Sequence, residues 1–126
     1  MKIQAQPMIA VKDMRVSTNW YATLLGLEPG HGGGLYEQML SEGQLVLQLH
    51  DMEIEDEHGK FRDASVPVGN GALLWFAVAD FDKVVEAAKR LKARVDLPPY
   101  INPMSKHWEI WLRDPDGYRV VVAANS

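Results

Sequence analysis

The side chains best suited to chemistry in this chain of 126 residues are histidines, carboxylates and amides in strand-like segments. Cysteine is absent, which excludes cysteine nucleophiles, disulfides, thiolate zinc sites and iron–sulfur clusters. His107 and Glu109 are two positions apart in a strand-like run, so both side chains lie on one face of a strand. A histidine beside a carboxylate can transfer protons near neutral pH. We therefore take His50, His107 and Glu109 as acid–base candidates, with a surface ion pair as the simpler alternative.

The alternation of side chains along each expected strand separates an apolar face from a mixed one. The mixed faces combine tryptophans with amides, imidazoles and charges: Gln4, Gln6, Met8, Gln48, His50, Trp75, His107, Glu109, Trp111 and Arg119. Apolar walls with a few polar groups are typical of a small-molecule groove. The expected ligand-binding residues are Gln6, Gln48, His50, Trp75, His107, Glu109, Trp111 and Arg119. A half-solvated sheet, or a dimer interface that uses the tryptophans, remains the alternative.

Three further features are expected to lie in loops. His31 and His58 are interpreted as solvated rather than metal-binding, and the segment 30–34 as a flexible glycine-rich loop. An acidic run follows His50 and would attract cations to the mouth of a groove, although such runs are usually solvated loops. Its members are Asp51, Glu53, Glu55, Asp56 and Glu57.

An internal repeat indicates which elements position these residues. Ala-Val-Lys-Asp-Met at 10–14 returns as Ala-Val-Ala-Asp-Phe at 77–81, and each copy follows a strand-like run and opens a helical pattern. Asp13 and either Asp80 or Asp82 are the candidate N-caps, and Gly26 is a candidate C-terminal cap. The helical stripes are Val16, Trp20, Tyr21, Leu24 and Leu25 in the first half, and Phe81, Val84, Val85, Ala88 and Leu91 in the second.

After each helical pattern the sequence predicts paired strands. The segments 36–40 and 45–50 are divided by Ser41-Glu42-Gly43, and the segments 107–113 and 118–123 by Asp114-Pro115-Asp116-Gly117. Both turns end in an acidic residue and a glycine, which favour tight hairpins. The segment 51–71 between the halves is long for a plain connection.

This pattern resembles the vicinal oxygen chelate superfamily, which includes glyoxalases, dioxygenases and bleomycin-resistance proteins. The matching residues run from Val11-Lys12-Asp13-Met14 through Trp20-Tyr21 to Leu25-Gly26-Leu27, and from Glu109 to Tyr118. The resemblance implies a single α+β domain over 1–126, built from two βαβββ modules at about 1–64 and 71–126. The modules would form a curled mixed sheet around a cleft, with the helices on the outer face, usually in a homodimer.

The resemblance also implies where metal ligands would lie. The corresponding positions in this chain are Gln6, Gln48, Leu73 and Val121. Leucine and valine have no ligand atom, and two neutral amides hold a transition metal poorly. We therefore expect no cofactor, with a divalent metal at a displaced site, made from Gln6, Gln48, His50, His107 and Glu109, as the alternative.

Together these features favour a small-molecule-binding protein similar to the bleomycin-resistance branch, with a metal-free, aromatic and partly acidic cleft for drug or metabolite sequestration. Trp75 and Trp111 would stack on a small aromatic or cationic molecule, whereas Trp108 lies on the packed face. The alternative is a glyoxalase-like lyase or isomerase, or a dioxygenase-related enzyme. A net charge of −4 argues against nucleic acid, and the lack of a long apolar run argues against a membrane. We expect a cytoplasmic protein.

Overall fold

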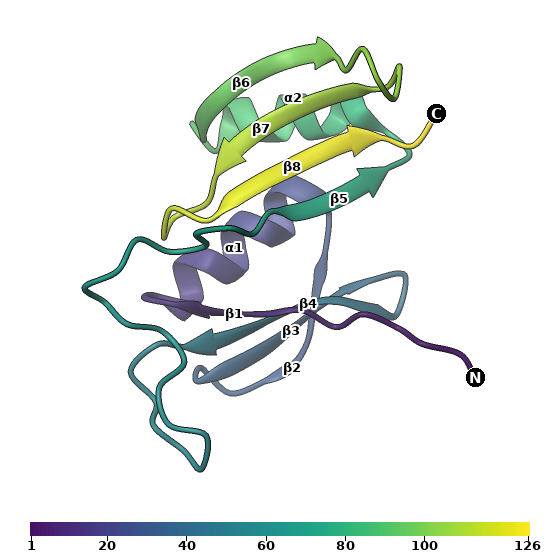
Figure 1. Ribbon diagram of the computed structural model, residues 1–126. Coiled ribbons are helices and arrows are strands. Elements are labelled where there is room, and N and C mark those ends of the chain that lie inside the picture. The colour runs from purple at the N-terminus through teal and green to yellow at the C-terminus, as the bar shows by residue number, and fades with distance from the viewer. The chain divides into compact units, whose positions relative to one another are not determined.

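Each half of the chain folds as one helix and one four-stranded sheet, in a computed structural model that describes residues 1–126 (Figure 1). Two compact units result, Met1–Val66 and Pro67–Ser126. The first contains β1 (Met8–Val11), α1 (Met14–Leu25), β2 (Glu28–Gly32), β3 (Tyr36–Ser41) and β4 (Gln44–Asp51). The second contains β5 (Leu74–Val78), α2 (Phe81–Arg90), β6 (Arg94–Ile101), β7 (Trp108–Arg113) and β8 (Arg119–Ala124).

The two sheets share one topology. Their strand orders are β1-β4-β3-β2 and β5-β8-β7-β6. In each sheet the first strand of the unit pairs in parallel with the last, and the other neighbours are antiparallel. The predicted α+β architecture of two βαβββ modules with mixed sheets is confirmed. Neither helix is long and apolar enough to span a membrane.

Both helices begin at an aspartate, as the repeat predicts. The Val16 N–H donates to Asp13 Oδ1 at 3.1 Å, and the Lys83 N–H donates to Asp80 Oδ1 at 3.1 Å. Of the two candidates for the second cap, Asp80 is therefore the one used. Gly26 ends α1 with a φ of 66°, the left-handed conformation that glycine adopts without strain.

The buried face of α1 contains Trp20, Tyr21 and Leu24 of the predicted stripe but differs from it at the ends of the helix. Val16 is 41% exposed, and Ser17 is fully buried in its place. Met14 and Ser17 extend the buried row toward the start of the helix at intervals of three residues. The buried residues are Met14, Ser17, Trp20, Tyr21 and Leu24 in α1, and Phe81, Val84, Ala87 and Ala88 in α2.

The glycine-rich segment that was expected to be a loop instead contributes an edge strand. Residues of β2 pair with β3 through an irregular register. A Cβ atom at Gly30 would lie 2.4 Å from the Leu40 side chain, and one at Gly32 would lie 1.8 Å from the Tyr36 carbonyl oxygen. The glycines are thus needed for close approach of two strands rather than for flexibility.

The face of each sheet that meets its helix forms a core. In the first unit Val11, Leu47 and Leu49 are fully buried, and in the second Leu112 and Val120 are fully buried. These residues have the strand parity predicted for packing against a helix.

The turn before β8 is closed by the Asp114 carboxylate, whose Oδ1 accepts hydrogen bonds from the backbone N–H groups of Asp116, Gly117 and Tyr118 at 2.9 Å each.

Candidate functional sites

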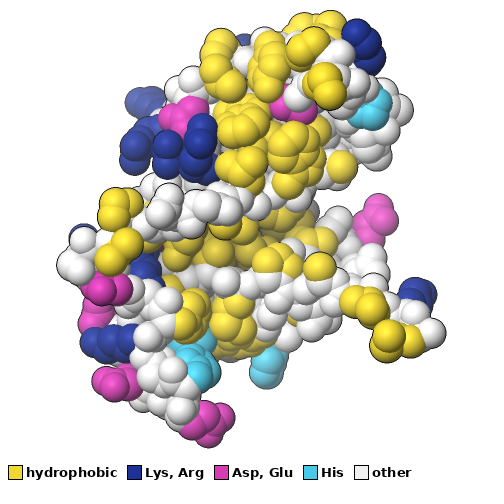
Figure 2. Space-filling model, in the orientation of Figure 1, with side chains coloured by type: hydrophobic (Ala, Val, Ile, Leu, Met, Phe, Trp, Pro, Cys, Tyr) yellow, Lys and Arg dark blue, Asp and Glu magenta, His cyan; other side chains and the backbone are white.

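The helix-distal face of the second sheet brings together two tryptophans and an arginine, which we call the tryptophan face: Trp75, Trp111 and Arg119. The register places Trp75 of β5 and Trp111 of β7 on either side of Val121 in β8. The indole centroids are 6.4 Å apart in an edge-to-face arrangement, and the Arg119 guanidinium carbon lies 5.0 Å from the Trp111 ring centroid. Trp75 is 49% exposed. Figure 2 shows hydrophobic side chains gathered on this unit, with basic and acidic groups at their edge.

Glu109 lies under this face and is 1% exposed. Its Oε1 accepts hydrogen bonds from the Tyr100 hydroxyl at 2.8 Å and from Trp111 Nε1 at 3.1 Å. Its Oε2 accepts from Asn102 Nδ2 at 3.0 Å. The hydrogen bond to Glu109 is the main cause that raises the pKa of Tyr100 above its usual value, with burial adding to it. Glu109 therefore holds Trp111 and Tyr100 in place, and each of its oxygens accepts at least one hydrogen bond.

Charges of both signs lie beside the tryptophans. Asp96 Oδ2 lies 2.7 Å from Arg113 Nε and 3.7 Å from Arg119 Nε. One carboxylate thus faces two guanidinium groups, and the buried Glu109 carboxylate supplies a second negative charge next to Trp111. Arg113 also donates from Nη1 to the Gly117 carbonyl at 3.1 Å, so Arg119 is the less restrained of the two.

Sequence reasoning missed three polar partners on this unit, namely Asp96, Tyr100 and Asn102. Two of them belong to β6, whose pairing with β7 shifts register twice and whose middle carries Pro98 and Pro99. A strand with such irregularities has no constant alternation, so parity does not assign its faces. The acid Asp96 beside Arg94 would have been the available signal.

His107 does not contact Glu109. Its backbone N–H donates to Ser105 Oγ at 3.2 Å and its carbonyl accepts from the Asn102 N–H at 2.9 Å, whereas all three Glu109 bonds involve other residues. The two side chains are therefore not brought together as an acid–base pair. Trp108 stacks on Phe81 at 6.3 Å between centroids, on the helix side where parity placed it.

In the first unit Gln48 joins neighbouring segments and offers no free ligand atom. Its Nε2 donates to the Gln6 carbonyl at 3.0 Å, and its Oε1 accepts from the Tyr36 hydroxyl. Gln6 is exposed and precedes β1. Leu73 precedes β5, and Val121 is fully buried in β8. The residues at the four positions that the resemblance assigns to metal ligands do not fit a metal ion.

His50 has different neighbours, which the sequence interpretation placed in a solvated loop. Its Nε2 lies 3.7 Å from Asp56 Oδ2, and His58 Nε2 lies 2.8 Å from Asp56 Oδ1. The three residues offer ligand atoms that all lie within 4.8 Å of one another. His58 is exposed, as expected for a loop residue, but its imidazole lies against the Asp56 carboxylate. The Asp-x-His spacing after a strand-terminal histidine was the signal available.

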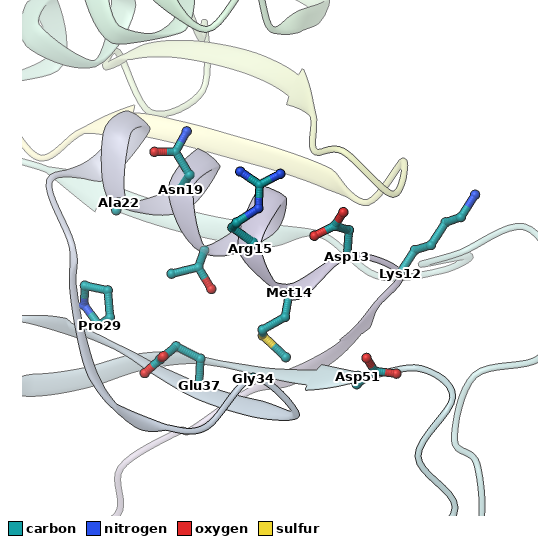
Figure 3. A pocket seen from close by; sticks show the side chains of 11 residues that line it. Lys12, Asp13, Met14, Arg15, Asn19, Ala22, Pro29, Gly34, Glu37 and Asp51 are labelled. Carbon is teal, nitrogen blue, oxygen red and sulfur yellow. The ribbon is translucent and has the colours of Figure 1, made fainter.

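A groove of about 690 Å³ runs along α1 on the helix side of the first sheet (Figure 3). The sequence did not predict this groove, because strand parity placed the polar and aromatic side chains on the helix-distal faces. Arg15 and Asn19 of α1 and Glu37 and Asp51 of the strands are among the residues that line it. Its lining carries charges of both signs, so the groove has no single chemical character.

A comparison with protein families matches residues 3–122 to the model described as the Glyoxalase/Bleomycin resistance protein/Dioxygenase superfamily. No curated protein matches the sequence.

Several solved structures share the fold. A glyoxalase-related enzyme from Fulvimarina pelagi has a TM-score of 0.75 at 19% identity, over 97% of this chain and 88% of that one. A glyoxalase/bleomycin resistance protein from Albidiferax ferrireducens T118 has a TM-score of 0.73 at 23% identity, over 98% of both chains. A lactoylglutathione lyase from Agrobacterium tumefaciens has a TM-score of 0.67 at 20% identity, over 97% of this chain and 93% of that one. At these identities the likeness concerns the fold.

Proposed function

We propose that this chain, which belongs to the glyoxalase/bleomycin resistance protein/dioxygenase superfamily, is a small-molecule-binding protein. Its ligand would stack on the tryptophan face. The observation that carries this proposal is the exposure of Trp75 beside a fixed partner. A half-exposed indole on an otherwise ordered sheet is an apolar surface that a planar ligand would remove from water.

The fixed partner is Trp111. Its indole N–H is held by a buried carboxylate, so little side-chain freedom is lost when a ligand binds against its ring. Trp75 meets that ring edge to face, which leaves two indole surfaces at a large angle. Such a corner suits a planar aromatic ligand.

The accessible charge at the tryptophan face favours an anionic substituent over a cationic one. Glu109 is 1% exposed beneath its three uncharged donors, so a cationic ligand cannot reach its carboxylate. Arg119 lies over Trp111 and shares Asp96 with Arg113, which leaves a guanidinium available to an acidic group. The ligand class we propose is therefore a planar aromatic molecule with an acidic group, sequestered as a drug or a metabolite.

The test uses a matched pair of probes, anilinonaphthalene sulfonate as the anionic aromatic and ethidium as the cationic one. Titration followed by calorimetry should give tighter binding of the sulfonate, and Trp75→Ala should weaken that binding about tenfold, since an aromatic contact contributes ~1 kcal/mol or more. Trp108→Ala, on the helix side, is the control. Equal affinity of wild type and Trp75→Ala would refute the proposal, as would preference for ethidium.

A glyoxalase-like or dioxygenase-related enzyme is the second candidate, and the His50–Asp56–His58 cluster is the observation that favours it. Of the two histidine candidates, His50 has a carboxylate close to its ring, with Asp56 Oδ2 3.7 Å from its Nε2. Turnover of a hemithioacetal by the purified protein, abolished by His50→Ala, would support this reading over simple sequestration. We also propose a cytoplasmic homodimer, for which native mass spectrometry at micromolar concentration measures the subunit number.

A further inference from the structure

We propose that His50, Asp56 and His58 form a binding site for a divalent transition metal such as Zn²⁺ or Co²⁺. The site lies within the first unit, on the helix-distal side of its sheet, and uses none of the four positions at which the resemblance locates metal ligands. The proposal does not depend on ligand binding at the tryptophan face.

Both imidazoles present the same nitrogen to Asp56. His50 Nδ1 lies 2.8 Å from the Asp51 carbonyl oxygen, and His58 Nδ1 lies 2.7 Å from the Gly59 carbonyl oxygen. A carbonyl oxygen only accepts, so each Nδ1 is a donor and each Nε2 is the nitrogen that faces the Asp56 carboxylate. This is the arrangement that commonly orients metal-binding histidines in proteins. A metal ion bound between these groups would take the place of a proton on Nε2.

The separations suit a small metal ion. Two ligands at bond lengths of 2.0–2.1 Å and a tetrahedral angle lie about 3.3 Å apart. The two Nε2 atoms lie 3.7 Å and 2.8 Å from carboxylate oxygens of Asp56. These two distances differ from that value by about half an ångström, and all the ligand atoms lie within 4.8 Å of one another. Rotation of the exposed Asp56 and His58 side chains can bring the three groups to bonding distance.

The elements around the cluster hold it together without a metal. His50 is at the end of β4 and 9% exposed, whereas the other two ligands come from the turn after it, closed by a Gly59 N–H donated to the Asp56 carbonyl at 2.8 Å. The Phe61 ring meets the edges of both imidazoles at centroid distances of 5.2 and 5.6 Å. Arg62 Nη1 donates to the Ala10 carbonyl at 3.0 Å, which attaches the end of the turn to β1.

The donor set indicates the class of metal. Two imidazole nitrogens and one carboxylate suit zinc, cobalt and nickel, whereas calcium and magnesium prefer oxygen ligands. Three protein ligands leave at least one coordination position for water or an exogenous ligand, as in open zinc sites. A plain surface ion pair between Asp56 and His58 would need neither His50 nor the matched orientation of both rings.

The test uses tag-free protein dialysed against chelator and then titrated with ZnCl₂ or CoCl₂. We expect one metal per chain, visible d–d absorption of bound Co²⁺, and no response to MgCl₂. His50→Ala, His58→Ala and Asp56→Asn should each weaken binding by about 100-fold or more, since even loss of an outer-shell partner costs 10–100-fold.

His31→Ala and His107→Ala are the matched controls, because these histidines lie outside the cluster, and both should bind like wild type. Circular dichroism of each variant establishes that it is folded. Binding that survives all three cluster substitutions, or that depends equally on His31, overturns the proposal. Zinc binding that requires His58 and Asp56 but not His50 also overturns it, because the site would then be only an exposed pair.

Discussion

Replacement of Glu109 by glutamine tests whether a buried carboxylate organises the second unit. The change keeps the size of the side chain but replaces one accepting oxygen by an NH₂ group. That group would face Asn102 Nδ2, which is also a donor. Asn102 cannot turn its amide without loss, because its Oδ1 accepts the backbone N–H of Met104 at 2.8 Å.

The expected cost is about 2 kcal/mol of unfolding free energy. One hydrogen bond is lost with a buried donor left unpaired, which costs ~1–3 kcal/mol, and the bonds from Tyr100 and Trp111 to Oε1 lose their charge. Relief of the desolvation of a buried carboxylate offsets part of this. For a chain of this size the midpoint of thermal unfolding should fall by about 6–8 °C.

Urea unfolding monitored by circular dichroism measures the effect, with Glu86→Gln as the control. Glu86 is 64% exposed and pairs only with Lys89, so its replacement should change stability by less than about 0.5 kcal/mol. A Glu109→Gln variant as stable as this control would refute the reasoning.

Exchanging the carboxylate and the amide between positions 109 and 102 separates loss of the Glu109–Asn102 hydrogen bond from general destabilisation of the unit. Asn102→Asp alone would place two carboxylates together and should be more destabilising than Glu109→Gln. In the double variant Glu109→Gln/Asn102→Asp, the new carboxylate can accept a hydrogen bond from the new amide. The loss of unfolding free energy in the double variant should therefore be smaller than the sum of the losses in the two single variants. Additive losses would contradict the assigned contact.

Three further outcomes follow from contacts elsewhere in the two units. Tyr100 has a raised pKa because it donates to Glu109, so the folded state holds this proton more tightly than the unfolded chain does. The contribution of this proton to stability is complete below pH ~10 and is lost as the pH rises through the folded-state pKa. Glu109→Gln should therefore move the tyrosinate absorbance transition to lower pH. Gly32→Ala should destabilise the first unit by about 1–3 kcal/mol because the new Cβ meets a carbonyl oxygen, whereas Gly33→Ala, with open space around it, should be near neutral in thermal unfolding. Asp80→Ala should cost ~1 kcal/mol through loss of the α2 N-cap, measured by denaturant unfolding, and an unchanged midpoint would contradict that role.

The sequence alone determined the modules, their helices and the faces of the regular strands. These features depend on local rules: an aspartate that caps the next turn, a glycine that ends α1, and alternation that assigned Leu47 and Leu112 to the cores. Trp75 and Trp111 were also predicted to share a mixed face, because constant parity extends across paired strands.

Only the tertiary structure decided which polar groups meet. Tyr100 and Asn102 reach Glu109 from β6 and the residue after it, where two shifts of register interrupt the alternation that a sequence can reveal. Asp56 and His58 reach His50 because a turn folds back beside the strand that precedes it, and nothing periodic in the sequence encodes that return. Residue types limit which chemistry is available, but an irregular strand and a turn have no period, so their contacts are fixed by the folded chain.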